Sequence, residues 1–334
     1  MGFLKEIYKY TTSDEELLER LVRGVRVSTN AQYDSTWKRF VQFLQKEKPR
    51  NINADIVMRF LNKEFKEGKQ ASTLASYKSA LKTPLMLGFG FHMDHVVLQT
   101  LSKNFALERP KTKGKKIDWK LSDILDLLSS DEYNGDDISL DHCLQKTLFL
   151  ISLVSGYRAD EVFAFYRGGA YISRQRNGYT LHPIESHRAK NETDTNQREP
   201  LSFKELTENE KLCPVRSLDK YLQMTAQYDR GRLFRNSRVG SSLSLKSYSS
   251  ILSTLASKAS GKAPGEVQMT VHHIRSVATS FAAARGATST ELASFTGWKS
   301  TRVFEQHYVT HIESPRHIFM ACGRVIRPDT EQLT

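Results

Sequence analysis

Apolar residues recur at helical spacing over most of the first hundred residues. After Thr29, large apolar side chains fall three or four positions apart, at Tyr33, Trp37, Phe40, Val41 and Leu44. This spacing places them on one face of a helix, and Thr29-x-x-Gln32 predicts a capping box at its start. Three more helices are predicted, at about 54–67, 72–87 and 93–107. Gly68 and Gly88 are expected to end the first two of these.

The aromatic side chains of this region allow two interpretations. Tyr33, Trp37 and Phe40 could form a platform on which nucleic-acid bases stack. At helical spacing, however, they are expected to pack in a core. Residues 1–108 are therefore predicted to form a compact helical domain.

The second part of the chain, residues 119–334, mixes helical and extended patterns. A helix is predicted from Trp119, and the almost wholly apolar run Cys143–Val154 predicts a buried helix that stops at Gly156. Short strands are expected at 171–173, 179–182 and 184–187, and further helices at 217–227 and 244–260. Asn177-Gly178 supplies a hairpin turn. The fold class is mainly α with a small β-sheet or hairpin.

The chain is basic, and one short segment concentrates that charge. The sequence has 49 Lys and Arg against 37 Asp and Glu, a net charge of +12, which favours a nucleic acid or an anionic membrane surface as partner. Residues 109–118 are predicted to be an extended connector between two domains. This connector is either a solvated loop or import signal, or a strap across a phosphate backbone. The candidate DNA contacts in it are Arg109, Lys111, Lys113, Lys115 and Lys116.

Composition also indicates the cellular setting. No apolar run reaches the roughly 18 residues needed to span a bilayer. The three cysteines, Cys143, Cys213 and Cys322, are odd in number and scattered, so reduced thiols and an intracellular location are expected. In a eukaryotic cell that location would be the nucleus.

The densest group of chemically capable residues lies near the end of the sequence. His272 and Arg275 are three apart at the start of a predicted helix that Thr270 would cap, so both can face one anion. Thr288-x-x-Glu291 is a capping box for the next short helix, which is expected to bury Leu292 and Phe295 and to stop at Gly297. Trp298 follows, and a last helix carries Phe304 and Tyr308 on one face.

The order His-x-x-Arg, Gly-Trp and Tyr resembles the tyrosine recombinase (phage integrase) family. The resemblance is most specific over residues 271–309 and covers most of the chain. Ser155-Gly156-Tyr157-Arg158 matches the family's earlier arginine, and Lys190 matches its lysine on a β-hairpin. Leu212-Cys213-Pro214-Val215 and Gly297-Trp298 are similar to a eukaryotic branch, the recombinases of DIRS-type retrotransposons and cryptons.

The resemblance implies a role for each matching residue. Arg158 and Arg275 would hold the nonbridging phosphate oxygens, Lys190 would protonate the leaving 5′-oxygen, and His272 would assist. Arg188, close to Lys190 in the sequence, would contact the DNA. Tyr308 would be the nucleophile. Trp298 stands where most members have histidine and can donate a hydrogen bond but cannot take a proton. Glu161, three residues after Arg158, is expected to orient that arginine.

The resemblance also implies an architecture and a partner. Residues 1–108 would be the helical core-binding (SAM-like) domain, 109–118 the linker and 119–334 the catalytic domain, together forming a clamp on double-stranded DNA. The family acts as a tetramer on two DNA sites, without a metal, nucleotide or other cofactor.

Other interpretations of the same residues remain. A type IB topoisomerase-like enzyme would religate the same strand, and a recombinase-derived regulator would bind DNA without cleaving it. A metal site is disfavoured, because His307 and His311 lack the glutamate of a zinc-protease motif and His92 and His95 lack further ligands nearby.

Overall fold

The computed structural model describes residues 3–9, 11–25, 27–110, 117–184, 187, 200–237, 240–284 and 286–296. The chain divides into two compact units, Met1–Lys115 and Lys116–Thr334. The division falls inside the predicted 109–118 connector. Each unit has its own hydrophobic core.

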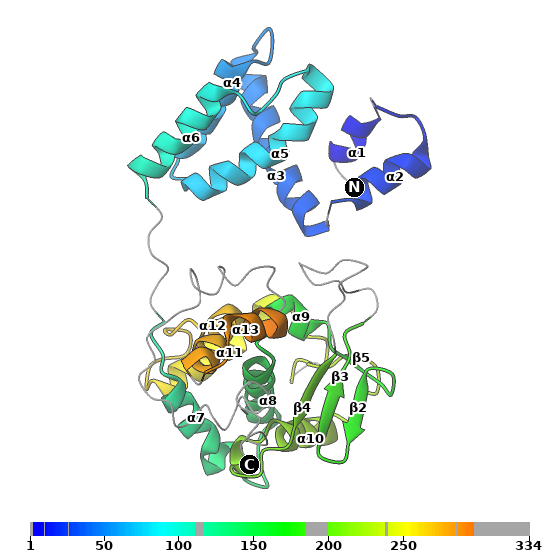
Figure 1. Ribbon diagram of the computed structural model, residues 1–334, viewed down its shortest axis with the longest axis vertical. Helices are drawn as coiled ribbons and strands as arrows, with labels where there is room; N and C mark the ends of the chain where they lie inside the picture. The colour runs from blue at the N-terminus through cyan, green and yellow to red at the C-terminus, as the bar shows by residue number, and fades with distance from the viewer. Residues whose placement is uncertain are drawn as a thin grey trace, which may run out of the picture. The chain divides into compact units, whose positions relative to one another are not determined.

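The described part of the first unit is helical, as predicted (Figure 1). Its helices are α1 (Phe3–Tyr8), α2 (Glu15–Arg23), α3 (Val27–Glu47), α4 (Ala54–Lys66), α5 (Ala71–Phe89) and α6 (Val96–Glu108). Trp37 and Phe40 of α3 are buried in one cluster with Phe60 of α4, whose ring contacts that of Phe40, and Trp37 Nε1 donates a hydrogen bond to Ala80 O of α5 at 3.1 Å. These two aromatics are core residues, which excludes them from a base-stacking platform. Tyr33 is half-buried.

Two predicted helix ends of the first unit are wrong. Helix α3 begins at Val27, so Thr29 lies inside it and does not cap it. Instead Asn30 Nδ2 donates to Val22 O and Val25 O, which ties the start of α3 to the end of α2. Helix α5 continues through Gly88 to a left-handed cap at Gly90, where φ is +64°. Packing of the α5 apolar face outweighs the preference of Gly88 for a helix end.

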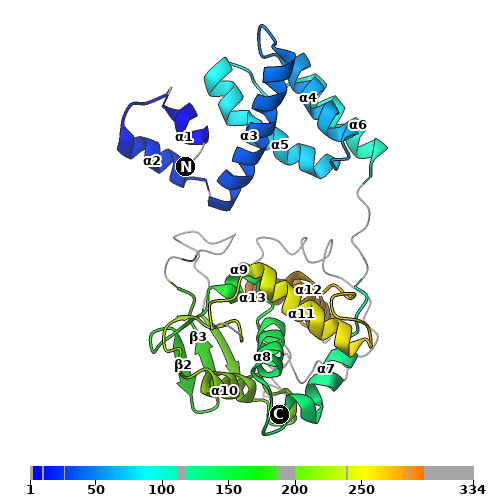
Figure 2. The ribbon, with the colours of Figure 1, turned by 180° about the vertical axis from the view of Figure 1, so that it is seen from behind.

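The second unit is built around α8 (Leu140–Ser155), which Figures 1 and 2 show at its centre. All but a few of the α8 side chains are buried, as the apolar run predicted, and Gly156 ends the helix with φ of +56°. The helices around it are α7 (Leu121–Ser129), α9 (Ala159–Phe163), α10 (Pro214–Met224), α11 (Leu245–Ala259), α12 (Val271–Ala284) and α13 (Ser289–Thr296). Short 3-10 turns cover Asp131–Tyr133 and Glu210–Leu212.

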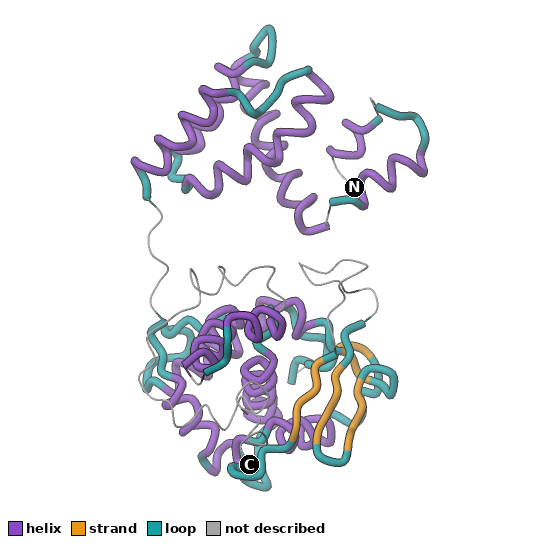
Figure 3. The backbone as a smooth tube through the Cα atoms, viewed as in Figure 1, coloured by secondary structure: helices purple, strands orange, loops and turns teal. Residues whose placement is uncertain are grey.

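A small antiparallel sheet lies on one side of this unit (Figure 3). Its strands, in order, are β2 (Ile172–Gln175), β3 (Gly178–Leu181) and β4 (Leu201–Lys204). Gln175 pairs with Gly178, so the predicted hairpin is present, but its turn lies one residue earlier than predicted, at Arg176 and Asn177, and Gly178 is the first residue of β3. Gly178 is needed there because a Cβ atom would lie 2.3 Å from Phe203 O of β4. A separate pair joins β1 (Tyr166–Arg167) to β5 (Gly231–Arg232).

The two described ends of the predicted strand at 184–187 are not in a strand: His187 N donates to Ile184 O at 2.9 Å, as in a turn, and residues 185 and 186 lie outside the described part of the chain. Ile184 N donates to Ala164 O at 3.0 Å, and Pro183 forms an isolated bridge with Phe165. Proline has no N–H to donate to a strand ladder, so β3 ends before Pro183. The edge of β3 that does not pair with β2 pairs with β4.

Candidate active site

Arg158 lies at the junction between two consecutive helices in the core of the second unit. Gly156 ends α8, and Arg158 becomes the N-cap of α9. Its backbone N donates to Glu161 Oε2 at 2.6 Å, and its Nη1 donates to Glu161 Oε1 at 3.0 Å. Glu161 therefore holds both the backbone and the guanidinium of Arg158, as expected from their spacing. The Arg158 side chain is 23% exposed, whereas that of Glu161 is 3% exposed.

Arg275 reaches the same carboxylate from a distant part of the sequence. It lies on α12, and its side chain is fully buried. Its Nη1 is 3.8 Å from Glu161 Oε2, and its Nη2 donates to Thr296 O, the last residue of α13, at 2.9 Å. A buried arginine needs such compensation, because an uncompensated charge in the interior is costly. One carboxylate thus joins two guanidinium groups from α9 and α12.

The start of α12 positions the two histidines differently. Thr270 Oγ1 accepts a hydrogen bond from His273 N at 3.2 Å, and Thr270 O accepts from Ile274 N at 3.1 Å, which confirms the predicted N-cap. His272 is exposed and His273 is half-buried. Burial lowers the pKa of His273, although the Gln268 backbone and the Asp118 charge act in the opposite direction. His272 therefore has the accessible ring of the pair.

Helix α13 supports this arrangement from the other side. Thr288 N and Oγ1 donate to Glu291 Oε2, and Glu291 N donates to Thr288 Oγ1, so the predicted capping box is present. Leu292 is buried, as predicted. The contact between Thr296 O and Arg275 was not predicted. Sequence spacing gives no signal for it, because a carbonyl group belongs to every residue.

Several predicted site residues lie outside the described part of the chain. They are Lys190, Arg188, Trp298 and Tyr308, together with the linker lysines Lys111, Lys113, Lys115 and Lys116. The same holds for His307, His311 and the predicted helix around Tyr308. Their assigned roles stay predictions.

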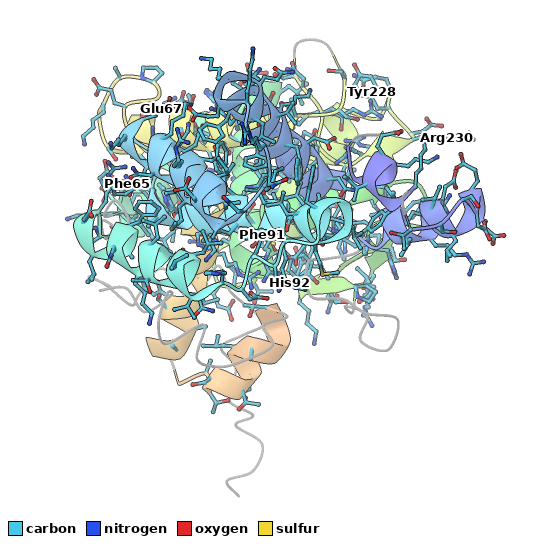
Figure 4. The ribbon with its side chains drawn as sticks, turned by 90° about the horizontal axis from the view of Figure 1, so that it is seen from above. Phe65, Glu67, Phe91, His92, Tyr228 and Arg230 are labelled. Atoms are coloured by element: carbon cyan, nitrogen blue, oxygen red, sulfur yellow. The ribbon has the colours of Figure 1, made fainter. Side chains whose placement is uncertain are left out.

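Arg109, the described candidate of the linker, has contacts within the first unit. Its Nη1 donates to Phe65 O at 3.1 Å and to Lys69 O at 2.7 Å. Its guanidinium lies 4.1 Å from the centre of the Phe65 ring, which Figure 4 labels near the end of α4. Arg109 therefore caps α4, and its assignment to DNA stays a prediction.

Metal-binding and membrane-spanning features are both absent from the described residues. Within them, no three or more His, Cys, Asp or Glu side chains gather where a metal ion could be held. Among their helices, none combines the length and the apolar character that crossing a bilayer requires.

Comparison with known proteins bears on both units. The profile of the phage integrase N-terminal SAM-like domain matches residues 15–84, within the helical first unit. No curated protein sequence matches the chain significantly.

Solved structures match nearly the whole chain at low identity. The lambda integrase dimer bound to a COC′ core site is 16% identical, with a TM-score of 0.53, and the match covers 90% of this chain and 94% of that one. The Tn1549 transposon integrase in complex with transposon right end DNA is 13% identical, with a TM-score of 0.56, and the match covers 93% of this chain and 96% of that one. The XerH recombinase bound to difH is 14% identical, with a TM-score of 0.55, and the match covers 86% of this chain and 78% of that one. The chain therefore has the two-domain fold of the tyrosine recombinases, with a phage integrase SAM-like domain in its first unit.

Proposed function

We propose that this protein is a tyrosine recombinase that cleaves and rejoins double-stranded DNA through a 3′-phosphotyrosyl intermediate. The observation that carries the proposal is the pairing of Arg158 and Arg275 through Glu161. Two fixed guanidinium groups from separate helices suit the two nonbridging oxygens of one phosphate, because the arginine fork matches phosphate geometry and is always charged.

The reaction assigns a task to each remaining candidate. Tyr308 loses its phenolic proton to solvent or to His272 acting as base, and its Oη attacks the scissile phosphorus. The bond to the 5′-oxygen breaks, leaving a 3′-phosphotyrosine and a 5′-hydroxyl. Lys190 donates the proton that the leaving oxygen needs. His272 assists as a hydrogen-bond donor or acid/base, and Trp298 donates a hydrogen bond. Arg158 and Arg275 stabilise the charge that develops on the phosphorane.

The energy balance requires no cofactor. The phosphotyrosine bond retains the energy of the cleaved phosphodiester, so a 5′-hydroxyl can attack it in the reverse sense. If that hydroxyl belongs to a partner strand, the outcome is recombination. If it belongs to the same strand, the outcome is topoisomerase-like religation.

Assembly on DNA favours the first outcome. The lambda integrase structure that matches this chain with a TM-score of 0.54 is a tetramer bound to a Holliday junction. We infer that this protein also forms a tetramer on two DNA sites, with its SAM-like unit and second unit gripping the duplex. We also propose that the protein originates from a DIRS-type or crypton element, because Leu212, Cys213, Pro214 and Trp298 are similar to residues of those recombinases.

A nicked DNA substrate that loses a short fragment on cleavage tests the proposal. Religation is then impossible, so the protein should be trapped covalently on the 3′ side of the break. Mass spectrometry of the adduct should locate the link at Tyr308. Tyr308→Phe removes only the hydroxyl and should bind DNA with unchanged affinity but form no adduct. An adduct with Tyr308→Phe, or a 5′ link, would overturn the assignment.

A further inference from the structure

Helix α9 contains Glu161 and begins directly after its N-cap Arg158, yet it is only five residues long. An isolated helix of this length is unstable in water, so contacts at its ends must hold it. Arg158 and Glu161 secure its N-terminal end through their mutual hydrogen bonds. At its other end, Phe163 stacks on the buried Tyr248 ring of α11 with ring centres 6.3 Å apart. The orientation of α9 therefore depends on what contacts Phe163.

Arg232 of β5 makes a second contact with that end. Its Nη1 donates to Phe163 O, the last carbonyl of α9, at 2.9 Å. Its guanidinium lies 4.4 Å from the centre of the Phe163 ring. One cation thus satisfies a carbonyl that the helix leaves unpaired and also faces the negative end of the helix dipole.

The backbone around Arg232 is fixed independently. Arg232 pairs with Tyr166 in the β1–β5 ladder, and Leu233 N donates to Phe165 O at 2.9 Å. The buried Arg167 donates from Nε to Leu233 O at 3.1 Å and from Nη1 to Thr225 O at 2.8 Å. The strand that carries Arg232 is therefore held in place next to α9 by hydrogen bonds that do not involve the Arg232 side chain.

The first unit contains the same arrangement on an ordinary helix. Arg109 donates to Phe65 O near the end of α4 while its guanidinium covers the Phe65 ring. In two places in this chain, therefore, an arginine stabilises a helix end by donating to the carbonyl of a phenylalanine and covering the ring of the same residue. At α9 the same pair of contacts acts on the helix that contains Glu161 and is capped by Arg158.

We propose that Arg232 is a positioning residue for the candidate site. It fixes the C-terminal end of α9, and α9 in turn places Glu161 between Arg158 and Arg275. This inference rests on the proposed recombinase function for its catalytic consequence, but not for the contact itself. Arg232 acts without touching the phosphate.

The test compares Arg232→Gln and Arg232→Lys with a matched control. Arg174→Gln is suitable, because Arg174 also lies over a ring, that of Tyr179 at 5.0 Å, and donates to the carbonyls of Gln175 and Gly178. It does so on the β2–β3 hairpin, without a described contact to α9. Three quantities are measured: hydrogen exchange of the peptide covering residues 158–165, DNA affinity, and single-turnover cleavage of the nicked substrate at saturating protein.

Arg232→Gln should speed exchange in α9 and slow cleavage by about 10- to 100-fold, since small displacements of catalytic groups cost rates of this size. DNA affinity should not change. Arg232→Lys keeps the cation but not the planar fork, so it should restore part of both effects. Arg174→Gln should leave α9 exchange and cleavage as in the wild type.

A modified substrate separates positioning from a general loss of stability. A methylphosphonate at the scissile position removes one charged nonbridging oxygen, and with it part of the need for the two site arginines. The cleavage defect of Arg232→Gln should shrink on this substrate, as should that of Arg158→Ala. A defect of equal size on both substrates would contradict positioning.

The remaining outcomes are distinct. Unchanged α9 exchange in both Arg232 variants would overturn the proposal, as would faster exchange with normal cleavage. If the wild-type protein itself forms no adduct, the recombinase function fails, while hydrogen exchange still decides whether Arg232 holds α9.

Discussion

Glu161 Oε2 lies 3.8 Å from Arg275 Nη1, although the two residues belong to helices far apart in the sequence. The other oxygen of the same carboxylate accepts a hydrogen bond from Arg158 Nη1 at 3.0 Å. Glu161 and Arg275 are both almost fully buried. The carboxylate therefore neutralises part of the positive charge gathered there and sets the separation of the two guanidinium groups before any phosphate binds.

Replacing this carboxylate is predicted to damage both stability and cleavage. Glu161→Gln keeps the shape but removes the charge, which leaves buried Arg275 without its acid. Removing one partner of a buried ion pair costs on the order of 3–5 kcal/mol, and urea unfolding measures this change. The trapping assay should show slower adduct formation.

Asp160→Asn is the matched control for Glu161→Gln. Asp160 is an acid in the same first turn of α9, where its negative charge interacts favourably with the helix dipole. Its replacement should cost less than about 1 kcal/mol and leave cleavage intact. Equal effects of the two substitutions would mean that Glu161 acts only through the helix dipole.

A second prediction concerns Arg275 itself. Lysine keeps the charge but has no fork, so Arg275→Lys cannot contact both Glu161 and Thr296 O. Cleavage should slow by roughly 100-fold or more, because removing one fixed donor to a developing oxyanion costs about 3–4 kcal/mol. Binding to intact DNA should persist. Arg216→Lys, at an exposed arginine paired with Glu205 and Glu210, should cleave at the wild-type rate. Wild-type cleavage by Arg275→Lys would remove Arg275 from the site.

Local patterns in the sequence are sufficient to predict much of this architecture. The apolar run Cys143–Val154 predicts α8, and the i, i+3 spacing selects His272 with Arg275 on α12. Caps such as Thr270 and Thr288 are predictable because their partners lie within three residues. These features depend on near neighbours, so the sequence order reveals them.

The features that local patterns do not predict depend on contacts between distant segments. The pattern favours a third strand at 184–187, whereas β3 pairs with Leu201–Lys204 across a long connection. Strand pairing of this kind is set by packing and not by local preference. The approach of Arg275 to Glu161 and Thr296 likewise follows from how α12 and α13 pack. Lys190, Trp298 and Tyr308 rest on sequence resemblance.

A third prediction concerns the basic connector. Replacing Lys111, Lys113, Lys115 and Lys116 by Ala should weaken binding to all DNA sequences alike. In a plot of log affinity against log salt, the slope should shrink by about 0.9 for each phosphate that these lysines neutralise in the wild-type complex. An unchanged slope would show that the connector does not lie on DNA.

Arg109 should behave differently from those lysines. Because it caps α4 through Phe65 O and Lys69 O, Arg109→Ala should lower the free energy of unfolding of the first unit, by about 1–3 kcal/mol. If Arg109→Ala leaves stability unchanged but reduces the salt slope, its main role is on DNA.

The last prediction uses the different settings of the two neighbouring histidines on α12. Burial lowers the pKa of His273 in the folded protein, whereas in the unfolded chain it stays near 6.5. As the pH falls below about 7.5, the unfolded chain therefore binds a proton that the folded protein resists, and stability declines until the folded pKa is passed. His273→Gln should reduce this acid-side decline in urea unfolding between about pH 7.5 and 5 and should cleave normally. His272→Gln should instead slow cleavage, because the exposed ring is the one assigned to the phosphate. If His273→Gln slows cleavage as much as His272→Gln, or retains the full acid-side decline, the division of roles between the two histidines is wrong.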